Sequence, residues 1–335
     1  MDIIFDVPQG LKVNPPSADN LYDVAIIGSG PAGMTATVYC SRKKLDTLLI
    51  TKDIGGQVLL TSGIENYMGY QYVTGKELSD KFFGQIAQFP IALLSDISVC
   101  KLKLSKGNFS LSCGEKKFSA KSVIITTGKR SKELGVPGEK ELLGRGVAYC
   151  ATCDAPLFKD RIVAVIGGGN SALTAAIDLL SYSTKIYLIN VADTIQGDPV
   201  LIEKISAAGG SADFYGGKKS GKVEIIFDSE ITEIKGEKTV EAISLKNIKT
   251  QQIRQISVGG VFIEVGLTPN SEFVKGILHL NASGEIIIDC NSRTSVPGVF
   301  AAGDVTSVQD KQIIIAAGEG AKAALSAYRY LLEKK

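Results

Sequence analysis

The chain has 335 residues, of which 44% are hydrophobic and 21% charged, and its formal net charge is +2. This length accommodates two domains with substantial cores. The near balance of charge gives no electrostatic reason to expect nucleic acid or a membrane surface as a partner. No apolar run approaches the roughly 20 residues of a membrane-spanning helix, so we expect a soluble protein.

Residues 1–20 contain too short an apolar stretch, and too many polar and proline residues, for a secretory signal. We interpret them as a surface extension before the first domain. Four of the six cysteines are scattered, and only Cys150 and Cys153 are closely spaced. Because this is not the disulfide framework of a secreted protein, we expect a cytoplasmic location.

The first structural unit is predicted over residues 22–51. An apolar strand at 24–27 leads into Gly28–Gly33, a helical pattern, and a second apolar run at 48–50. The glycine segment reads GSGPAG, which is G-x-G-x-x-G between a strand and a helix. In this pattern the first glycine permits the turn, the second lets backbone reach a pyrophosphate, and the third allows close packing. The helix N-terminus adds amide donors, so the unit predicts a dinucleotide site.

Two signals follow in the middle of the chain. Residues 123–128, VIITTG, form an apolar strand ending in Thr-Thr-Gly, a pattern often found close to a bound flavin nucleotide. Residues 149–158, YCATCDAPLF, hold two cysteines three positions apart. A disulfide there closes a very small ring and gains little loop entropy, which suits reversible reduction. Zinc would need about four ligands, and His279 is the only histidine. A structural disulfide is disfavoured in a cytosolic chain, so we predict a redox pair.

A second glycine unit is predicted over residues 161–190. Strands at 162–166 and 185–189 flank GGGNSA and a helical pattern, and Ala172 takes the place of the third glycine. Within residues 294–305 a further strand, 299–302, ends in Gly303-Asp304, where a carboxylate can accept hydrogen bonds from sugar or ribityl hydroxyls. A helical pattern continues from there to the end of the chain. Two dinucleotide units and one dithiol indicate electron transfer between carriers.

The order of these segments predicts an α/β protein with two Rossmann-like nucleotide-binding domains of three-layer ββα type, the second inserted in the first. Residues 1–20 would be the extension. Residues 21–129 and 263–335 would form a discontinuous nucleotide-binding domain, to which the resemblance given below assigns FAD. Residues 130–262 would form the insert, a second nucleotide-binding domain that carries the CxxC and to which the resemblance given below assigns a pyridine nucleotide.

In this order the segments GSGPAG, GGQVLLTSGIENYMG, TTG, CATCDAPLF, GGGNSA and GVFAAGDVTSVQDKQIII resemble the low-molecular-weight thioredoxin reductases and the flavoprotein subunit of alkyl hydroperoxide reductase. The resemblance covers residues 21–335. It implies FAD in the first domain, a pyridine nucleotide in the second, a homodimer, and rotation of the insert to expose the CxxC alternately to flavin and to a protein partner. The FAD-binding residues it implies are Gly28, Ser29, Gly30, Pro31, Ala32, Gly33, Thr51, Gly56, Gln57, Asn66, Thr127, Gly128, Gly303, Asp304, Lys311, Gln312 and Ile313. Those for the pyridine nucleotide are Gly167, Gly169, Asn170 and Ser171.

The resemblance also assigns roles around the CxxC. It implies that Cys153 faces the flavin, that Cys150 attacks the disulfide of the partner, and that Asp154 is the acid that protonates the leaving thiolate. The alternative for Asp154 is an N-cap of the turn that follows it. The expected partner is thioredoxin or a glutaredoxin-like protein. We expect it to be separate, because the chain has no room for the roughly 200 residues of a fused thioredoxin-like pair.

The electron donor is left open by the residues. NADPH-dependent members of the family carry His-Arg-Arg where this chain has LINVADTIQGDP, residues 188–199, which contain no Arg or Lys. Asn190 and Asp193 are the side chains available there for a ribose. NADH is therefore expected rather than NADPH, and ferredoxin is the alternative donor. A flavin-binding electron-transfer or scaffold protein without its own turnover is a further alternative, against which CATCD argues.

Residues 207–224 are predicted to form a loop or hairpin without an assigned function.

Overall fold

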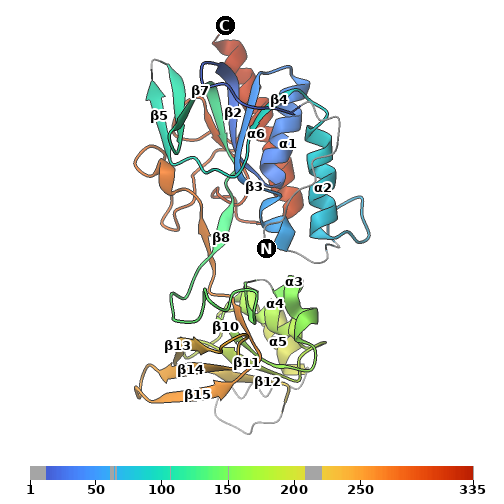
Figure 1. The fold of residues 1–335 in the computed structure, drawn as a ribbon, viewed down its shortest axis with the longest axis vertical. Helices are drawn as coiled ribbons and strands as arrows, with labels where there is room; N and C mark the ends of the chain where they lie inside the picture. Colours follow the sequence, from blue (N-terminus) through green and yellow to red (C-terminus); the bar gives the residue numbers. More distant parts are fainter. Residues whose placement is uncertain are drawn as a thin grey trace. The chain divides into compact units, whose positions relative to one another are not determined.

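The computed structural model describes residues 13–60, 64, 66–105, 107–149, 151–207 and 221–334. The chain divides into two compact units (Figure 1). Unit 1 comprises Met1–Arg130 and Thr268–Lys335, and unit 2 comprises Ser131–Leu267. No helix in the described ranges is long and apolar enough to cross a membrane.

Unit 1 contains an eight-stranded sheet in the order β1-β4-β3-β2-β7-β6-β5, with β18 also paired to β7. Pairing is parallel from β1 to β7 and for β18, and antiparallel between β5, β6 and β7. The sheet is covered on both faces, as parallel strands require. Its strands are β1 Val13–Asn14, β2 Leu21–Ser29, β3 Thr47–Ile54, β4 Ile91–Leu94, β5 Lys101–Ser105, β6 Asn108–Cys113, β7 Lys116–Ile125 and β18 Val299–Ala301.

Side chains of β2 alternate between two cores because successive residues of a strand point to opposite faces. Val24 and Ile26 pack with helices α1 (Pro31–Arg42), α2 (Gly75–Ile86) and α6 (Ile313–Glu333), which Figure 1 shows on one side of the sheet. Ala25 and Ile27 pack on the other face with side chains of the β5–β6–β7 meander. Short 3-10 helices, η1 Gly56–Leu60 and η3 Glu272–Val274, complete the unit.

Two residues of the predicted N-terminal extension belong to the sheet of unit 1. Residues 1–12 lie outside the described residues. Val13 and Asn14 form β1, which pairs in parallel with Ile91 and Ala92 of β4. Val13 also packs against the helix-side core. Backbone pairing with the exposed edge of β4 and burial of one apolar side chain therefore add this segment to the sheet.

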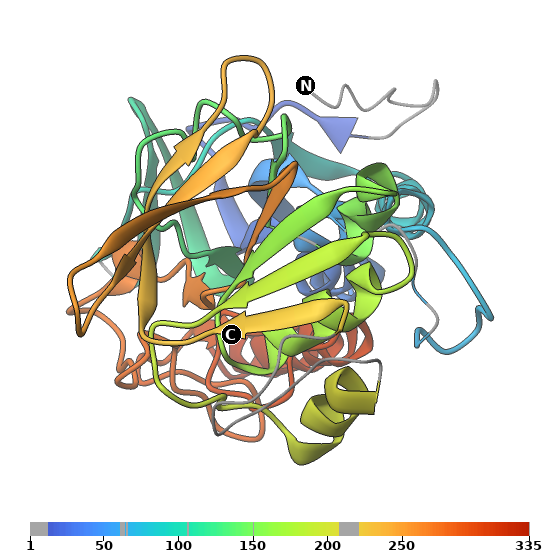
Figure 2. The same cartoon turned by 90° about the horizontal axis from the view of Figure 1, so that it is seen from below.

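Unit 2 repeats the plan on a smaller scale. Its parallel sheet has the order β12-β11-β10-β16-β9. Helices pack on one face of this sheet, and the antiparallel sheet β13-β14-β15 packs on the other. Figure 2 shows these orange strands beside the green and yellow parallel strands. The predicted fold class is thus confirmed. The elements are β9 Val147–Ala148, α3 Ala151–Asp154, η2 Ala155–Phe158, β10 Ile162–Ile166, α4 Asn170–Leu179, β11 Lys185–Ile189, α5 Pro199–Ala207, β12 Val223–Ile226, β13 Ser229–Lys235, β14 Ala242–Asn247, β15 Ile253–Ser257 and β16 Gly260–Ile263.

Two short strands, β8 (Lys129–Ser131) and β17 (Leu267–Pro269), pair where the chain passes between the units. The second passage lies at residues 267 and 268, later than the expected 262 and 263. The reason is that β16 continues through Ile263, which pairs with Ile166 of β10. Most of the predicted 207–224 loop, residues 208–220, lies outside the described residues. Its last two residues begin β12, which pairs with β11.

Candidate active site

The first glycine turn joins β2 to α1 at the carboxyl edge of the unit 1 sheet. Gly28 has a φ of +106°, and a Cβ there would lie 2.5 Å from the carbonyl oxygen of Thr126. A Cβ on Gly33 would lie 1.9 Å from the carbonyl oxygen of Gly28. Larger side chains at these two positions would separate β2, α1 and the segment after β7. A Cβ on Gly30, in contrast, would meet nothing within 4 Å. Pro31 and Ala32 continue into the first turn of α1.

A second segment reaches the same edge from β3. The backbone N–H of Gly55 donates to the carbonyl of Ser29 at 2.8 Å. Gly56, with a φ of +58°, lies where a Cβ would be 3.4 Å from the Cα of Gly30. Thr51 is buried at the start of this segment, and its hydroxyl donates to the carbonyl of Asp53. Gln57 lies in η1 and donates to the carbonyl of Lys129 at 2.8 Å.

The Thr-Thr-Gly segment after β7 is held by a residue that the sequence analysis missed. Asn270 donates from its side-chain amide to the carbonyl of Thr127 at 2.8 Å, and its backbone N–H donates to the carbonyl of Gly128 at 3.0 Å. The hydroxyl of Thr127 in turn donates to the carbonyl of Asn270 at 2.7 Å. A Cβ on Gly128 would meet nothing within 4 Å. One side of this turn is therefore hydrogen-bonded to Asn270, and the other side faces open space.

Gly303 and Asp304 follow β18 at the same edge. A Cβ on Gly303 would lie 3.0 Å from the Cβ of Ala32, in the first turn of α1. Burial raises the pKa of Asp304, and the charges of Lys311 and Lys129 oppose that rise. Both lysines form ion pairs with Glu285, at 3.3 and 2.7 Å. The sequence analysis missed Lys129 and Glu285, which carry no local motif.

The N-terminus of α6 completes this edge. Gln312 is the N-cap residue, without a side-chain capping bond, and Ile313 is the first residue of the helix. The side-chain amide of Asn66 donates to the side-chain oxygen of Gln312 at 3.1 Å, which joins segments 246 residues apart. α6 lies directly against α1, because a Cβ on Gly320 would be 2.0 Å from the carbonyl of Ala32.

These residues fit the phosphate-containing cofactor that the sequence predicts. The hydroxyl of Ser29 is buried and has no hydrogen-bond partner among the described residues. The helices that begin at this edge, α1 and α6, lack a side-chain cap, whereas α2 is capped by the hydroxyl of Thr74. Unpaired first-turn N–H groups are the donors that bind phosphate at a helix N-terminus. The open space at Gly30 lies beside them.

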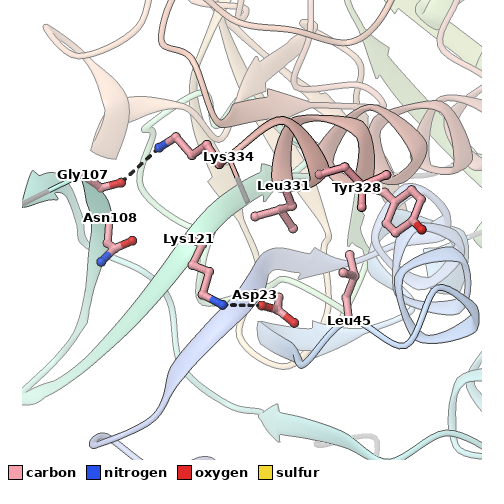
Figure 3. Close-up of a pocket in the computed structure, with 9 residues that line it drawn as sticks. Asp23, Leu45, Gly107, Asn108, Lys121, Tyr328, Leu331 and Lys334 are labelled. Atoms are coloured by element: carbon pink, nitrogen blue, oxygen red, sulfur yellow. Dashed lines mark hydrogen bonds and ion pairs between the residues drawn. The ribbon is translucent and has the colours of Figure 1, made fainter.

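A cavity of about 330 Å³ in unit 1 lies elsewhere (Figure 3). Asp23, near the start of β2, and Lys121, which lies beside it in β7, line the cavity together with the C-terminal turns of α6. Lys121 forms an ion pair with Asp23 at 2.8 Å, and Lys334 donates to the carbonyl of Gly107 at 3.3 Å. The cavity is therefore at the end of the strands opposite the glycine turn, and its lysines already have partners.

The second glycine turn joins β10 to α4 in unit 2. Gly167 has a φ of +139°, and a Cβ there would lie 2.3 Å from the carbonyl oxygen of Glu264. Gly169 is the N-cap of α4, without a side-chain cap, and a Cβ on it would meet nothing within 4 Å. Asn170 forms two hydrogen bonds with Asp198, at 2.9 and 2.7 Å. Ser171 is exposed in the first turn of α4.

Asn190 and Asp193, the two side chains after β11 that were expected to be available for a ribose, contact other protein groups instead. Asn190 is 5% exposed. Its side chain donates to the carbonyl of Thr194 at 2.7 Å and accepts the N–H of Ala192 at 3.2 Å, so its amide is used inside its own loop. Asp193 lies 3.7 Å from Lys249, which also pairs with Asp228 at 2.9 Å. Lys249, from the turn between β14 and β15, is a cation that the sequence analysis missed.

The CxxC segment rests on the unit 2 core. Cys150 lies outside the described residues; Cys153 lies in α3, and its side chain is outside them as well. Phe158 packs edge-on against Phe262 of β16, with ring centroids 4.8 Å apart. Leu157 is 72% exposed. Asp154 is half-buried, and burial raises its pKa. Asp154 also stands at the N-cap position of η2, but its side chain makes no capping hydrogen bond.

Glu139 holds the chain just before the CxxC. It is 1% exposed, and its carboxylate accepts the hydroxyl of Tyr149 at 2.6 Å. It also accepts the backbone N–H groups of Leu134, Gly135 and Val136, at 2.8, 2.6 and 3.4 Å. Burial acts to raise the pKa of Glu139, and these hydrogen bonds outweigh it, so the pKa lies below its ordinary value.

No group of three or more His, Cys, Asp or Glu side chains within the described ranges could hold a metal ion.

Comparison with known proteins agrees with this geometry. Among curated sequences, the chain is 38% identical over 312 residues to the alkyl hydroperoxide reductase F subunit of Staphylococcus aureus (strain MSSA476), covering 93% of this chain and 59% of that one. The corresponding protein of Pseudomonas putida is 38% identical over 328 residues, covering 97% and 60%. The chain thus spans about 60% of the length of these curated relatives.

Among solved structures, the thioredoxin reductase of Lactococcus lactis in its FR conformation matches with a TM-score of 0.76 and 36% identity, over 93% of this chain and 99% of that one. The thioredoxin reductase of T. acidophilum matches with a TM-score of 0.74 and 36% identity, over 92% and 98%. The resemblance inferred from the motifs is confirmed. Residues 22–320 match the family described as pyridine nucleotide-disulphide oxidoreductase. The chain therefore belongs to the pyridine nucleotide-disulphide oxidoreductase family.

Proposed function

We propose that this chain is an FAD-dependent disulfide oxidoreductase of thioredoxin-reductase type. With FAD bound, the Cys150–Cys153 disulfide would accept two electrons and would pass them on to a small redox protein. The observation that carries the proposal is the convergence of the Gly28–Gly33 turn, Gly128 and Gly303-Asp304 at one edge of the unit 1 sheet. Ligands of open α/β sheets bind outside the carboxyl ends of the strands, where these segments meet.

The residues of unit 1 would bind and orient the cofactor. The first-turn N–H groups of α1 and the hydroxyl of Ser29 would bind the pyrophosphate. Asp304 would accept a hydrogen bond from a ribityl or ribose hydroxyl, and the positive end of α6 would favour negative charge on the flavin ring. When bound, FAD supplies a two-electron carrier.

The chain's own thiols would complete the transfer. Reduction of the Cys150–Cys153 disulfide to one thiol and one thiolate consumes two electrons and one proton, and Asp154 would supply that proton to the leaving thiolate. A raised pKa suits this role because it keeps the carboxyl protonated at higher pH. The Cys150 thiolate would then attack the partner's disulfide to form a mixed disulfide. Attack by Cys153 would release the reduced partner and restore the disulfide.

NADH is the proposed donor. The loop after β11 brings together Asp193, Asp228 and Lys249, two carboxylates and one cation. This surplus of negative charge disfavours the 2′-phosphate that distinguishes NADPH. We propose thioredoxin or a glutaredoxin-like protein as the partner and a homodimer as the assembly, by likeness to the thioredoxin reductases.

The test is anaerobic mixing of the FAD-reconstituted protein with NADH, NADPH or reduced ferredoxin. Flavin absorbance and free thiols are measured together. We expect rapid loss of flavin absorbance with NADH, followed by two new thiols per chain. Reduction by NADPH alone would refute the donor assignment, and reduction by ferredoxin alone would replace it with the ferredoxin-dependent alternative. A protein that binds no FAD, or whose thiols stay oxidised when flavin is reduced, would refute the function.

A further inference from the structure

Three charged side chains of unit 1, Lys129, Glu285 and Lys311, lie together, and we call them the Glu285 cluster. The Oε1 atom of Glu285 lies 2.7 Å from the Nζ atom of Lys129 and 3.3 Å from that of Lys311. Its Oε2 atom accepts the side-chain amide of Asn281 at 2.6 Å. The side chains of Lys129, Glu285 and Lys311 are only 13%, 14% and 19% exposed. Because water and salt screen buried charges less than surface charges, this cluster acts on its surroundings more strongly than an exposed ion pair.

Hydrogen bonds place the Glu285 cluster against the segment that carries Asp304. Ile286, which follows the carboxylate residue of the cluster, donates its backbone N–H to the carbonyl of Val305 at 2.9 Å. The Nζ atom of Lys311 donates to the carbonyl of Thr306 at 2.5 Å. Val305 and Thr306 directly follow Asp304, so the cluster is held to the residues next to it.

Lys129 brings its charge to this place from the turn after β7. It directly follows Gly128, and its backbone carbonyl accepts the side-chain amide of Gln57 at 2.8 Å. The Glu285 cluster therefore joins two segments that the proposed function assigns to the cofactor, the turn after β7 and the turn after β18.

Glu285 is ionised at neutral pH, and the lysines of the cluster act on Asp304. Burial acts to raise the pKa of Glu285, and its bonds within the cluster and to Asn281 outweigh burial, so the pKa lies below its ordinary 4.5. Burial also raises the pKa of Asp304, and the charges of Lys311 and Lys129 oppose that rise. The two lysine charges therefore reach the carboxylate that would accept a cofactor hydroxyl.

We propose that the Glu285 cluster sets the reduction potential of the bound flavin, which Lys129 and Lys311 raise and Glu285 lowers. This inference rests on the proposed function in taking FAD as the cofactor of unit 1. Reduction of the flavin takes up two electrons and one proton, so it leaves one additional negative charge on the ring. Cations at this edge stabilise that charge, and a carboxylate disfavours it. Glu285 also offsets the repulsion between the two lysines, which keeps both of them at this edge.

The test measures the reduction potential of the flavin in the FAD-loaded full chain. Lys129→Met removes one positive charge, Glu285→Gln removes the negative charge and keeps an acceptor oxygen, and the double variant removes both charges. Lys121→Met is the matched control, because Lys121 pairs with Asp23 at 2.8 Å and lines the cavity in Figure 3, away from the glycine turn. Xanthine and xanthine oxidase supply electrons in the absence of oxygen, and a reference dye of known potential equilibrates with the flavin. Absorbance gives the reduced fraction of both, and circular dichroism and FAD content check each variant.

We expect Lys129→Met to favour oxidised flavin about tenfold, which lowers the potential of this two-electron couple by about 30 mV. Glu285→Gln should raise the potential by a similar amount. The double variant should return close to the wild-type value, because the two removed charges cancel. Lys121→Met should leave the potential unchanged, because its side chain is 43% exposed and its charge is screened. A purely structural role would shift both single variants in the same direction and the double variant at least as far.

Equal potentials in the wild type, Lys129→Met and Glu285→Gln would overturn the inference. Shifts of the same sign in both single variants, or a shift of equal size in Lys121→Met, would overturn it as well. Lys129→Gln removes the same charge with a side chain that can still donate to Glu285, so it decides the sign if Lys129→Met does not bind FAD. The measurement requires neither the thiols nor a partner protein. Unchanged potentials with normal flavin-to-thiol transfer therefore reject only the role of the cluster. Opposite shifts in a protein whose thiols stay oxidised reject the proposed function.

Discussion

Replacing Glu139 by Gln tests whether one buried carboxylate holds the approach to the CxxC. In the folded protein this carboxylate accepts the Tyr149 hydroxyl and the N–H groups of Leu134, Gly135 and Val136. The Gln side chain has one acceptor oxygen and one NH₂ group. Because the NH₂ group cannot accept, it would face N–H donors that are left without a partner.

The expected loss follows from these bonds. A hydrogen bond to a charged group contributes about 1.5–3 kcal/mol, and a buried donor without a partner costs about 1–3 kcal/mol. We therefore expect Glu139→Gln to lower the stability of unit 2 by about 3–4 kcal/mol at pH 7. Tyr149→Phe, which removes one of the four bonds, should lower it by about 1.5–2 kcal/mol. The Glu139 pKa is lower in the folded protein than its ordinary 4.5. Its contribution is therefore fully present above about pH 4.5 and is lost as the pH falls through the folded-state value.

Hydrogen exchange measured by mass spectrometry on peptides of β10 and α4 is the appropriate assay. It reports the opening free energy of unit 2 without requiring that the two units unfold together. Glu230→Gln on the surface of the same unit is the control and should change stability by less than about 0.5 kcal/mol. A loss below about 1 kcal/mol for Glu139→Gln would refute the reasoning. So would a loss that stays constant as the pH is lowered.

Three further predictions concern the proposed function. Cys150→Ser and Cys153→Ser should each abolish disulfide turnover while flavin stays bound, and turnover retained in either variant would exclude the dithiol mechanism. Leu157→Asp places a charge on a 72% exposed side chain close to the CxxC. Leu157→Asp should slow turnover with a protein partner about tenfold and leave the reduction of a small aromatic disulfide unchanged. Equal slowing of both reactions would argue against contact between Leu157 and the protein partner. Gly30→Ala should weaken FAD binding in equilibrium titration, because the new Cβ enters the open space beside the α1 N-terminus. Gly84→Ala, whose Cβ also meets open space but on α2, should leave FAD affinity unchanged. Equal FAD affinities in the two variants would contradict the assignment of the Gly30 turn as the phosphate site.

The sequence alone determined the features that depend on neighbouring residues. The predicted strands at 162–166 and 185–189 have the observed bounds of β10 and β11. The two glycine turns could be located because positive φ at Gly28 and Gly167 requires a residue type that the sequence displays. Alternating and continuous apolar runs likewise indicate strands that are covered on both faces, so the fold class was readable from local pattern.

Only the tertiary structure decided which distant residues meet these motifs. Asn270 bonds to Thr127 across 143 positions, and Lys129 pairs with Glu285 across 156. Lys249 joins Asp193 through the turn between β14 and β15. None of these residues carries a signal of its own, because a single Asn, Lys or Glu is compatible with an exposed surface. Their partners and their burial arise when segments far apart in the chain become neighbours in the fold, and that adjacency sets their hydrogen bonds and ion pairs.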